Sequence, residues 1–199
     1  IKGAQSTLEV ARTYFKLGVG HILDGIDHLL FILALMLLIR DPWTLVKTIT
    51  AFTIAHSITL TGAALGYFSL PQAPVEAVIA LSIAFVAREL LLMKPGEQRL
   101  SEASPWIVAF AFGLLHGFGF AGALKEIGLP QRDVPLALFT FNLGVEAGQL
   151  IFVGGMVVIY RLAASASPLP LRQMRGLAAY GIGAAAMFWL VTRLAAIVA

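Results

Sequence analysis

Six apolar segments, each long enough to cross a lipid bilayer, occupy most of this chain. An α-helix rises about 1.5 Å per residue, so about 20 apolar residues span a hydrocarbon core of about 30 Å. Only 13% of the 199 residues are charged and 59% are hydrophobic, whereas soluble domains are about 25% charged. The expected fold is therefore an all-α, polytopic membrane helical bundle with six transmembrane helices. The helices are expected at about residues 18–40, 44–68, 73–93, 104–125, 133–160 and 174–198.

The connections between these segments are short and rich in proline and glycine, as in RDPW, SLPQAP and GLPQRDVP, which is typical of turns. None is long enough to separate two domains, so residues 1–199 are expected to form a single transmembrane domain. The stretch QSTLEVARTYFKL has an amphipathic pattern, and Ser6 or Thr7 can cap its first turn. We expect residues 1–17 to be an interfacial segment with a short amphipathic helix, followed by a six-helix bundle over residues 18–198.

Lysine and arginine in the connections predict the orientation, because cytoplasmic loops carry an excess of these residues. The turn over residues 67–74 is uncharged and the loop before the last apolar segment is basic. This bias predicts a protein of the bacterial inner membrane with both termini in the periplasm. The chain begins with Ile1 rather than methionine, and we expect a processed or truncated product whose missing N-terminal periplasmic region precedes it.

Two compositional facts narrow the possible functions. The formal net charge is +3, but the basic residues lie in connections between apolar segments, where they set topology. Binding to nucleic acid is therefore not expected. There is no cysteine, which excludes disulfides, thiolate nucleophiles and thiolate metal ligands. Any metal must be held by nitrogen and oxygen atoms.

Ionisable residues recur inside the predicted spans. At 100° per residue, His21, Asp24, Asp27 and His28 fall in one sector of the first span. A charged group at the centre of a bilayer costs about 2.5–3.5 kcal/mol on insertion scales. Such residues normally face the interior of a bundle and have a partner there, so this sector is expected to face inward.

Histidines on other spans lie at a similar depth. His28, His56 and His116 each lie about half a span from the ends of their segments. The fifth span carries Asn142, Glu146 and Gln149 at i, i+4 and i+7, which places them on one face. Four helices are thus predicted to direct imidazole or carboxylate groups toward one level of the bilayer.

Imidazole and carboxylate together are a ligand set for a divalent transition metal such as nickel, zinc or cobalt, whereas Mg and Ca prefer oxygen alone. Asn142, Gln149 and Glu89 are expected to support the ligands through hydrogen bonds. No catalytic residue is assigned. The predicted metal ligands are His21, Asp24, Asp27, His28, His56, His116 and Glu146.

Each residue also has a purely structural interpretation. His56 can hydrogen-bond between helices, and Asp24 or Asp27 can cap a buried helix start. Glu76 is expected to be an exposed acid in a first helical turn, and Glu89 can pair with the arginine before it. These interpretations do not easily account for the whole set, because every histidine of the chain falls inside a predicted span. The set therefore favours a functional site.

The motifs HILDGIDHLLFILAL, FTIAHSITL, FGLLHGFGFAGAL and FNLGVEAGQL resemble the HupE/UreJ family of bacterial membrane proteins. The resemblance is to the longer branch, in which a periplasmic region precedes the membrane part. His21, Gly25, Asp27 and His28 match the family's His-Pro-x-x-Gly-x-Asp-His signature, and Ile22 stands where the signature has proline. That departure affects the helix start rather than a predicted ligand.

The resemblance implies a hydrogenase or urease accessory role, with nickel or a related divalent metal moving across the inner membrane. The leading hypothesis is therefore a permease rather than an enzyme, with the metal ion and the lipid bilayer as its partners. The alternative is an intramembrane, zinc-dependent hydrolase, which the concentration of polar groups in the outer half of the spans favours. A third interpretation is a metal-binding accessory subunit of a larger complex with a protein partner.

Overall fold

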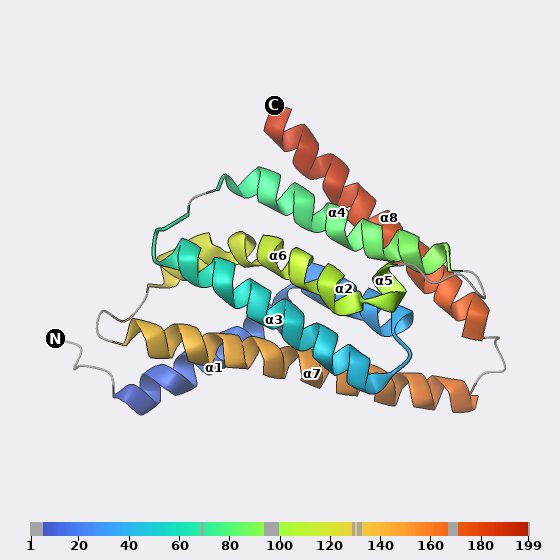
Figure 1. Cartoon of the computed structure of the whole chain (residues 1–199), viewed down its shortest axis with the longest axis horizontal. Helices are drawn as coiled ribbons and strands as arrows, with labels where there is room; N and C mark the ends of the chain where they lie inside the picture. The colour runs from blue at the N-terminus through green and yellow to red at the C-terminus, as the bar shows by residue number, and fades with distance from the viewer. Residues whose placement is uncertain are drawn as a thin grey trace.

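The computed structural model describes residues 6–68, 70–93, 100–128, 130, 133–166 and 171–198. Within these ranges the chain forms eight α-helices and no strand (Figure 1). The all-α class expected from the sequence is confirmed. The helices are α1 Thr7–Asp24, α2 Ile26–Leu38, α3 Pro42–Ala64, α4 Gln72–Leu91, α5 Leu100–Ala103, α6 Pro105–Ile127, α7 Val134–Ala166 and α8 Leu171–Val198.

Side-chain caps set where α1 and α3 begin. The Ser6 hydroxyl accepts a hydrogen bond from the Glu9 N–H, and the Glu9 carboxylate accepts one from the Ser6 N–H, which is a capping box. Asp41 caps α3, with Pro42 as the first helical residue. Hydrogen bonds from the hydroxyl and the N–H of Thr44 hold the pKa of the Asp41 carboxyl below its usual range.

The first predicted span is not one continuous helix. The helix that starts at Thr7 continues to Asp24, and the chain then bends by 71° at Gly25 before α2 begins. No boundary lies near residue 17, where we expected an interfacial segment to end. The reason is tertiary packing, since Val10 and Tyr14 of α1 are buried against α7 in one apolar cluster.

Close backbone contacts hold two pairs of helices together. A Cβ atom at Gly18 or Gly144 would collide with the backbone of the facing helix, at Phe141 and Phe15 respectively. These contacts bind α1 to α7. The contacts that α6 makes with α3 through Gly113 and Gly117 are equally close, and small residues are the usual means of such approach between membrane helices.

The remaining helices complete a bundle around α2. The third pair, α4 and α8, is joined near one end by the ion pair of Glu76 and Arg193, at 2.8 Å. Helix α2 contacts α3, α4, α7 and α8. In Figure 1, α1, α4 and α7 run away from the side of the N-terminus, and α3, α6 and α8 run back toward it. The starts of α1, α4 and α7 and the ends of α3, α6 and α8 therefore belong to one side of the bundle, termed here the terminal side.

Length and composition identify fewer membrane spans than the sequence analysis expected. Among the described residues, two helical segments are long and apolar enough to cross a membrane, Val134–Leu162 and Met174–Ile197. The bent pair of α1 and α2 makes a third if it counts as one span. A helical membrane protein is thus consistent with the fold.

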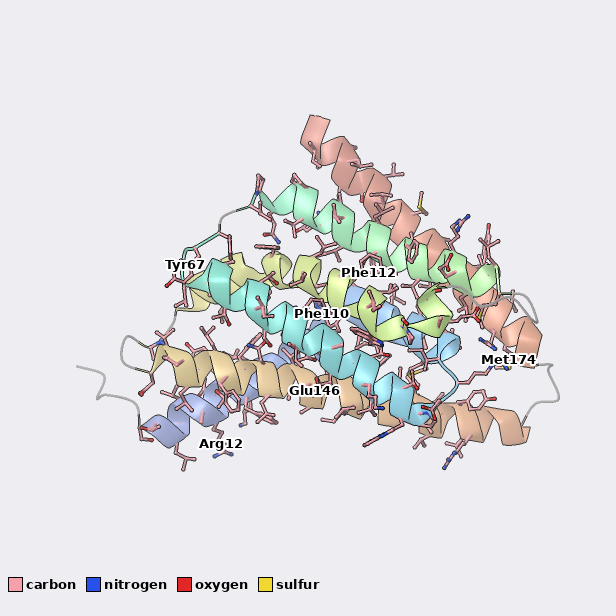
Figure 2. All side chains as sticks on the ribbon, in the orientation of Figure 1. Arg12, Tyr67, Phe110, Phe112, Glu146 and Met174 are labelled. Atoms are coloured by element: carbon pink, nitrogen blue, oxygen red, sulfur yellow. The ribbon has the colours of Figure 1, made fainter. Side chains whose placement is uncertain are left out.

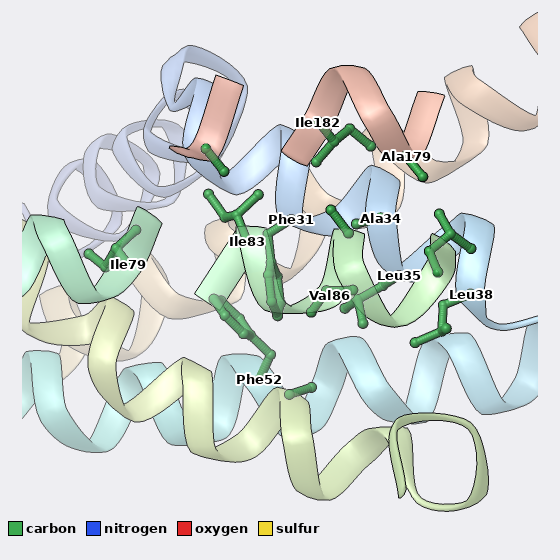
Figure 3. Packing of buried hydrophobic residues seen from close by; sticks show 14 of the residues in the cluster. Phe31, Ala34, Leu35, Leu38, Phe52, Ile79, Ile83, Val86, Ala179 and Ile182 are labelled. Carbon is green, nitrogen blue, oxygen red and sulfur yellow. The ribbon is translucent and has the colours of Figure 1, made fainter. Parts of the chain in front are cut away.

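An apolar core lies between α2 and α4 (Figure 3). It is built mainly from one face of α2 and one face of α4, and α3 and α8 close it. Its buried side chains include Phe31, Ala34, Leu35, Leu38, Phe52, Ile83, Val86, Ala179 and Ile182.

Candidate metal centre

Four histidines from four different helices meet in the interior. The ring centroid of His28 lies 4.6 Å from that of His21, 5.3 Å from that of His116 and 6.1 Å from that of His56. The rings of His21 and His56 are 5.8 Å apart. His28, His56 and His116 are 5%, 0% and 1% exposed. The inward direction predicted for the histidines is therefore observed, whereas Asp24 of the same sector is exposed. The four histidines are termed the histidine cluster.

The break between α1 and α2 brings two of these histidines together. Gly25 has an extended backbone, with φ −82° and ψ 95°, and its N–H donates to the His21 carbonyl. A Cβ atom at this position would lie 2.8 Å from His28 Nδ1 and 2.8 Å from the His21 carbonyl oxygen. A glycine is thus required here by the close approach of the His28 ring, not by a positive φ.

A hydrogen bond fixes which nitrogen of His28 is free. Its Nδ1 lies 3.2 Å from Asp27 Oδ1. An ionised carboxylate only accepts hydrogen bonds, so the bonding network assigns the proton to Nδ1. The other nitrogen, Nε2, is buried and has no hydrogen-bond partner among the described residues. It carries a lone pair directed into the interior.

His116 is oriented in the same way by a serine on α4. The Ser82 hydroxyl donates to the Ile79 carbonyl at 2.7 Å and lies 3.0 Å from His116 Nε2. Because the single hydroxyl proton is used on Ile79, the serine oxygen accepts from Nε2, and Nδ1 is left without a proton. Nδ1 is also buried, and it has no hydrogen-bond partner in the ranges that the structure describes. Metal-ligating histidines commonly hold their second nitrogen in this manner.

The donor set fits a transition metal. Asp27, His28 and His116 each offer one ligand atom, and these atoms all lie within 4.8 Å of one another. Bonds from zinc to imidazole nitrogen are about 2.0–2.1 Å, so the three side chains would have to move closer together to share one ion. His21 Nε2 and both ring nitrogens of His56 are likewise buried without a hydrogen-bond partner in the described part of the chain. Buried polar atoms are normally paired, so this concentration of unpaired nitrogens indicates a ligand.

A cavity of about 430 Å³ leads to this group. Asp27, His28 and His116 line its inner part, together with His21 and Phe120. Its other wall includes residues from the start of α4 and the end of α8, which lie on the terminal side of the bundle: Gln72, Glu76, Trp189 and Arg193. Asp24 also lines the cavity. The ligands are therefore approached from the terminal side.

The acids outside the cluster have protein partners. Glu76, expected to be an exposed acid, is paired with Arg193 on the cavity wall. Glu89 is buried, and its carboxylate accepts hydrogen bonds from Ser101 and, at 3.4 Å, from Arg88. Neither acid belongs to the group of three close ligand atoms.

The polar residues of α7 face α3 rather than joining that group. Glu146 accepts a 2.6 Å hydrogen bond from Thr50, and Gln149 accepts a 2.8 Å bond from Thr53. Asn142 donates to a carbonyl of its own helix, and its Oδ1 is buried without a partner among the described residues. The three hydroxyl partners Thr50, Thr53 and Ser82 were not identified from the sequence.

The family comparison covers nearly the whole chain. The family model described as "HupE / UreJ protein" matches residues 2–193. Comparison with curated proteins and with solved structures finds no match. Because the matched region far exceeds half of the 199 residues, the chain belongs to the HupE/UreJ family.

Proposed function

We propose that this protein binds a divalent transition metal, Ni(II) or a similar ion, at the histidine cluster and moves it across the bacterial inner membrane. One observation carries the proposal. His28 Nε2 and His116 Nδ1 are buried and have no hydrogen-bond partner among the described residues, and one ligand atom from each of Asp27, His28 and His116 lies within 4.8 Å of the others on the wall of a cavity. Membership of the HupE/UreJ family supports it, since resemblance to that family implies nickel handling.

The membrane placement is part of the proposal. Six spans with both termini in the periplasm fit the alternating directions of the helices, with α1 and α2 together forming one broken span. A break at mid-membrane depth is tolerated where the backbone lines a cavity. Large apolar side chains on the outer faces of α3 and α4 support contact with lipid, namely Ile54, Ile58, Leu81 and Phe85.

The charge of the cavity suits a divalent cation. Three carboxylates line it, from Asp24, Asp27 and Glu76, and one guanidinium, from Arg193. Their formal charges leave an excess of two negative charges. An entering ion would exchange its water ligands for these carboxylate oxygens and then for imidazole nitrogens. Transport requires that the protein bind the ion weakly enough to release it.

Purified full-length protein provides the test. Ni(II) binding is measured by calorimetry and by X-ray absorption, and Ni(II) uptake is measured in proteoliposomes. We expect His28→Ala and His116→Ala to weaken binding by at least about a hundredfold and to abolish uptake, because a lost ligand is not replaced by neighbouring groups. Ser57→Ala is the control, because that hydroxyl donates to its own helix. Unchanged Ni(II) binding in both histidine variants would refute the proposal.

An intramembrane hydrolase is the second candidate, and the cavity volume favours it. About 430 Å³ lies within the range of small-molecule pockets, about 300–1,000 Å³. Asp27, His28 and His116 would hold Zn(II), which activates water when bound, and Asp24 is a further carboxylate on the same wall. Tight, stoichiometric metal binding without flux in either direction would favour this function over transport.

A further inference from the structure

Polar side chains pair across α3 and α7 at a place the cavity does not reach. The Thr50 hydroxyl donates to Glu146 Oε1 at 2.6 Å, and the Thr53 hydroxyl lies 2.8 Å from Gln149 Oε1. Figure 2 shows Glu146 where α3 crosses α7. Thr50, Thr53, Glu146 and Gln149 are termed the α3–α7 seam, and none of them lines the cavity described above.

The seam lies beyond the histidine cluster as seen from the cavity. Helix α3 starts at Pro42, on the side opposite the termini, and runs toward the terminal side. Thr53 and Thr50 precede His56 by three and six residues, which is about 4.5 and 9 Å along the helix axis. The cavity approaches the cluster from the other direction. The seam therefore lies between the cluster and the far side of the bundle.

One carboxylate oxygen of the seam lacks a donor. Glu146 Oε2 is buried and has no hydrogen-bond partner among the described residues, although Oε1 is bonded to Thr50. Gln149 is only 1% exposed. Leaving a buried carboxylate oxygen unpaired is costly, and buried charges are normally paired or coordinate a metal. A cation between Glu146 and its neighbours would remove this cost.

The ligand chemistry of the seam differs from that of the cluster. The seam offers carboxylate, amide and hydroxyl oxygens, whereas the cluster offers four imidazole rings. Oxygen ligands suit hard cations such as Mn(II), while imidazole suits nickel and zinc. A late transition metal is therefore held less tightly by the seam than by the cluster.

We infer that the α3–α7 seam is a second, oxygen-based cation site, which receives the ion from the histidine cluster and releases it toward the far side of the bundle. The inference rests on the proposed transport function. A site of lower affinity after a site of higher affinity gives the graded binding that conduction requires. On the far side, most of the described faces of α2, α4 and α8 form the apolar core, and the buried acid Glu89 of α4 is bonded to Ser101. The seam is the polar group that continues from the cluster along α3.

Mn(II) is the probe for this site because it prefers oxygen and gives an electron paramagnetic resonance signal. The full-length protein is first loaded with one equivalent of Zn(II), which occupies the histidines, and is then titrated with Mn(II). We expect one bound Mn(II) in the wild type. Glu146→Gln and Thr50→Val should each weaken it by about tenfold or more, the low end of the effect of losing a supporting group at a metal site.

Matched controls separate ion binding from helix packing. Thr50→Ser keeps the hydroxyl and should bind Mn(II) as the wild type does. Thr48→Ala removes a buried hydroxyl of α3 whose one partner in the described part of the chain is the Thr44 carbonyl of its own helix, and it should also leave Mn(II) binding unchanged. If Glu146→Gln does not yield folded protein, the pair Thr50→Val and Thr50→Ser gives the same comparison.

The outcomes distinguish the two proposals. If the wild type does not bind Zn(II) or Ni(II) through histidine, the transport proposal itself fails. If histidine-bound Zn(II) is present and Mn(II) binding is absent, or equal in Glu146→Gln and wild type, only the second site is refuted. In proteoliposomes, Glu146→Gln should keep Ni(II) at the histidines while its flux falls by about tenfold, and an unchanged flux would also refute the second site.

Discussion

The two halves of the bundle are built from different chemistry, and α2 passes from one to the other. Its first turn carries Asp27 and His28, which line the cavity on the terminal side. Its last turns carry Leu35 and Leu38, which are buried in the apolar core. One helix of 13 residues thus contributes ligands at one end and packing at the other. Metal binding and stability should therefore respond to different substitutions.

The largest expected effect is on stability, in the apolar half. Leu35 is 2% exposed, so Leu35→Ala should leave a cavity and lower the free energy of unfolding by about 2–5 kcal/mol. Thermal unfolding in detergent measures this loss, and the Ni(II) affinity of the remaining folded protein should match the wild type. Leu81→Ala, on an exposed face of α4, is the control. An unchanged melting temperature in Leu35→Ala would contradict the assignment of this core.

The next effect is on ligand geometry, at the junction of α1 and α2. In Gly25→Ala the new Cβ would press on His28 Nδ1 and on the His21 carbonyl, both 2.8 Å away. Relieving such overpacking costs about 1–3 kcal/mol, and we expect Ni(II) affinity to fall by about tenfold or more. Gly20→Ala is the control, because its nearest neighbour, Asp24 Oδ2, is 3.6 Å away. Equal affinities in the two variants would mean that the close approach at Gly25 does not position His28.

A smaller effect on Ni(II) affinity is expected at Ser82, whose hydroxyl orients the ring of His116. Ser82→Ala removes the acceptor for His116 Nε2–H but keeps the ring in place. We expect Ni(II) affinity to fall by about tenfold, with little change in melting temperature. Calorimetry measures the affinity, and 15N NMR of the imidazole reports the tautomer. Retention of the Nε2–H tautomer at full affinity in Ser82→Ala would show that other groups fix the ring.

The smallest effect is expected at the mouth of the cavity. The pair of Glu76 and Arg193 is partly exposed, with side chains 31% and 52% accessible, and exposed pairs contribute less than about 1 kcal/mol. Glu76→Gln should lower the rate of Ni(II) binding only a few-fold at low ionic strength, and the difference should vanish in about 1 M salt, where the Debye length is about 3 Å. Stopped-flow measurements at two salt concentrations test this. A salt-independent loss would indicate that Glu76 ligates the ion directly.

The positions of the long helices could be predicted from the sequence. The length of an apolar segment and the proline and glycine residues that end it are local properties of the chain. Helix α4 was expected at about residues 73–93 and lies at Gln72–Leu91. The bend at Gly25 was not expected, because a single glycine does not interrupt the apolar periodicity around it. The bend accompanies the close packing of α1 on α7, which brings together residues more than 100 positions apart.

The ligand types could be predicted, but their partners could not. Histidines are rare enough in a membrane segment to be noticed, whereas helical hydroxyls commonly bond a carbonyl of their own helix, as those of Thr48 and Ser57 do. Nothing in the sequence distinguishes Ser82 or Thr50 from these. Glu146 was expected at the same site as the histidines because depth alone was considered, and depth does not determine which neighbouring helix a side chain meets.

The backbone contacts at the glycines place the four imidazoles on different packed units of the bundle. His56 and His116 belong to the closely packed pair of α3 and α6, which meet at Gly117. His21 belongs to the pair of α1 and α7. His28 lies on α2, which is separated from α1 by the break at Gly25. Rocking of one pair against the other would change how many nitrogens surround an ion without unwinding any helix. The same residues could then bind the ion tightly in one arrangement of the helices and release it in another.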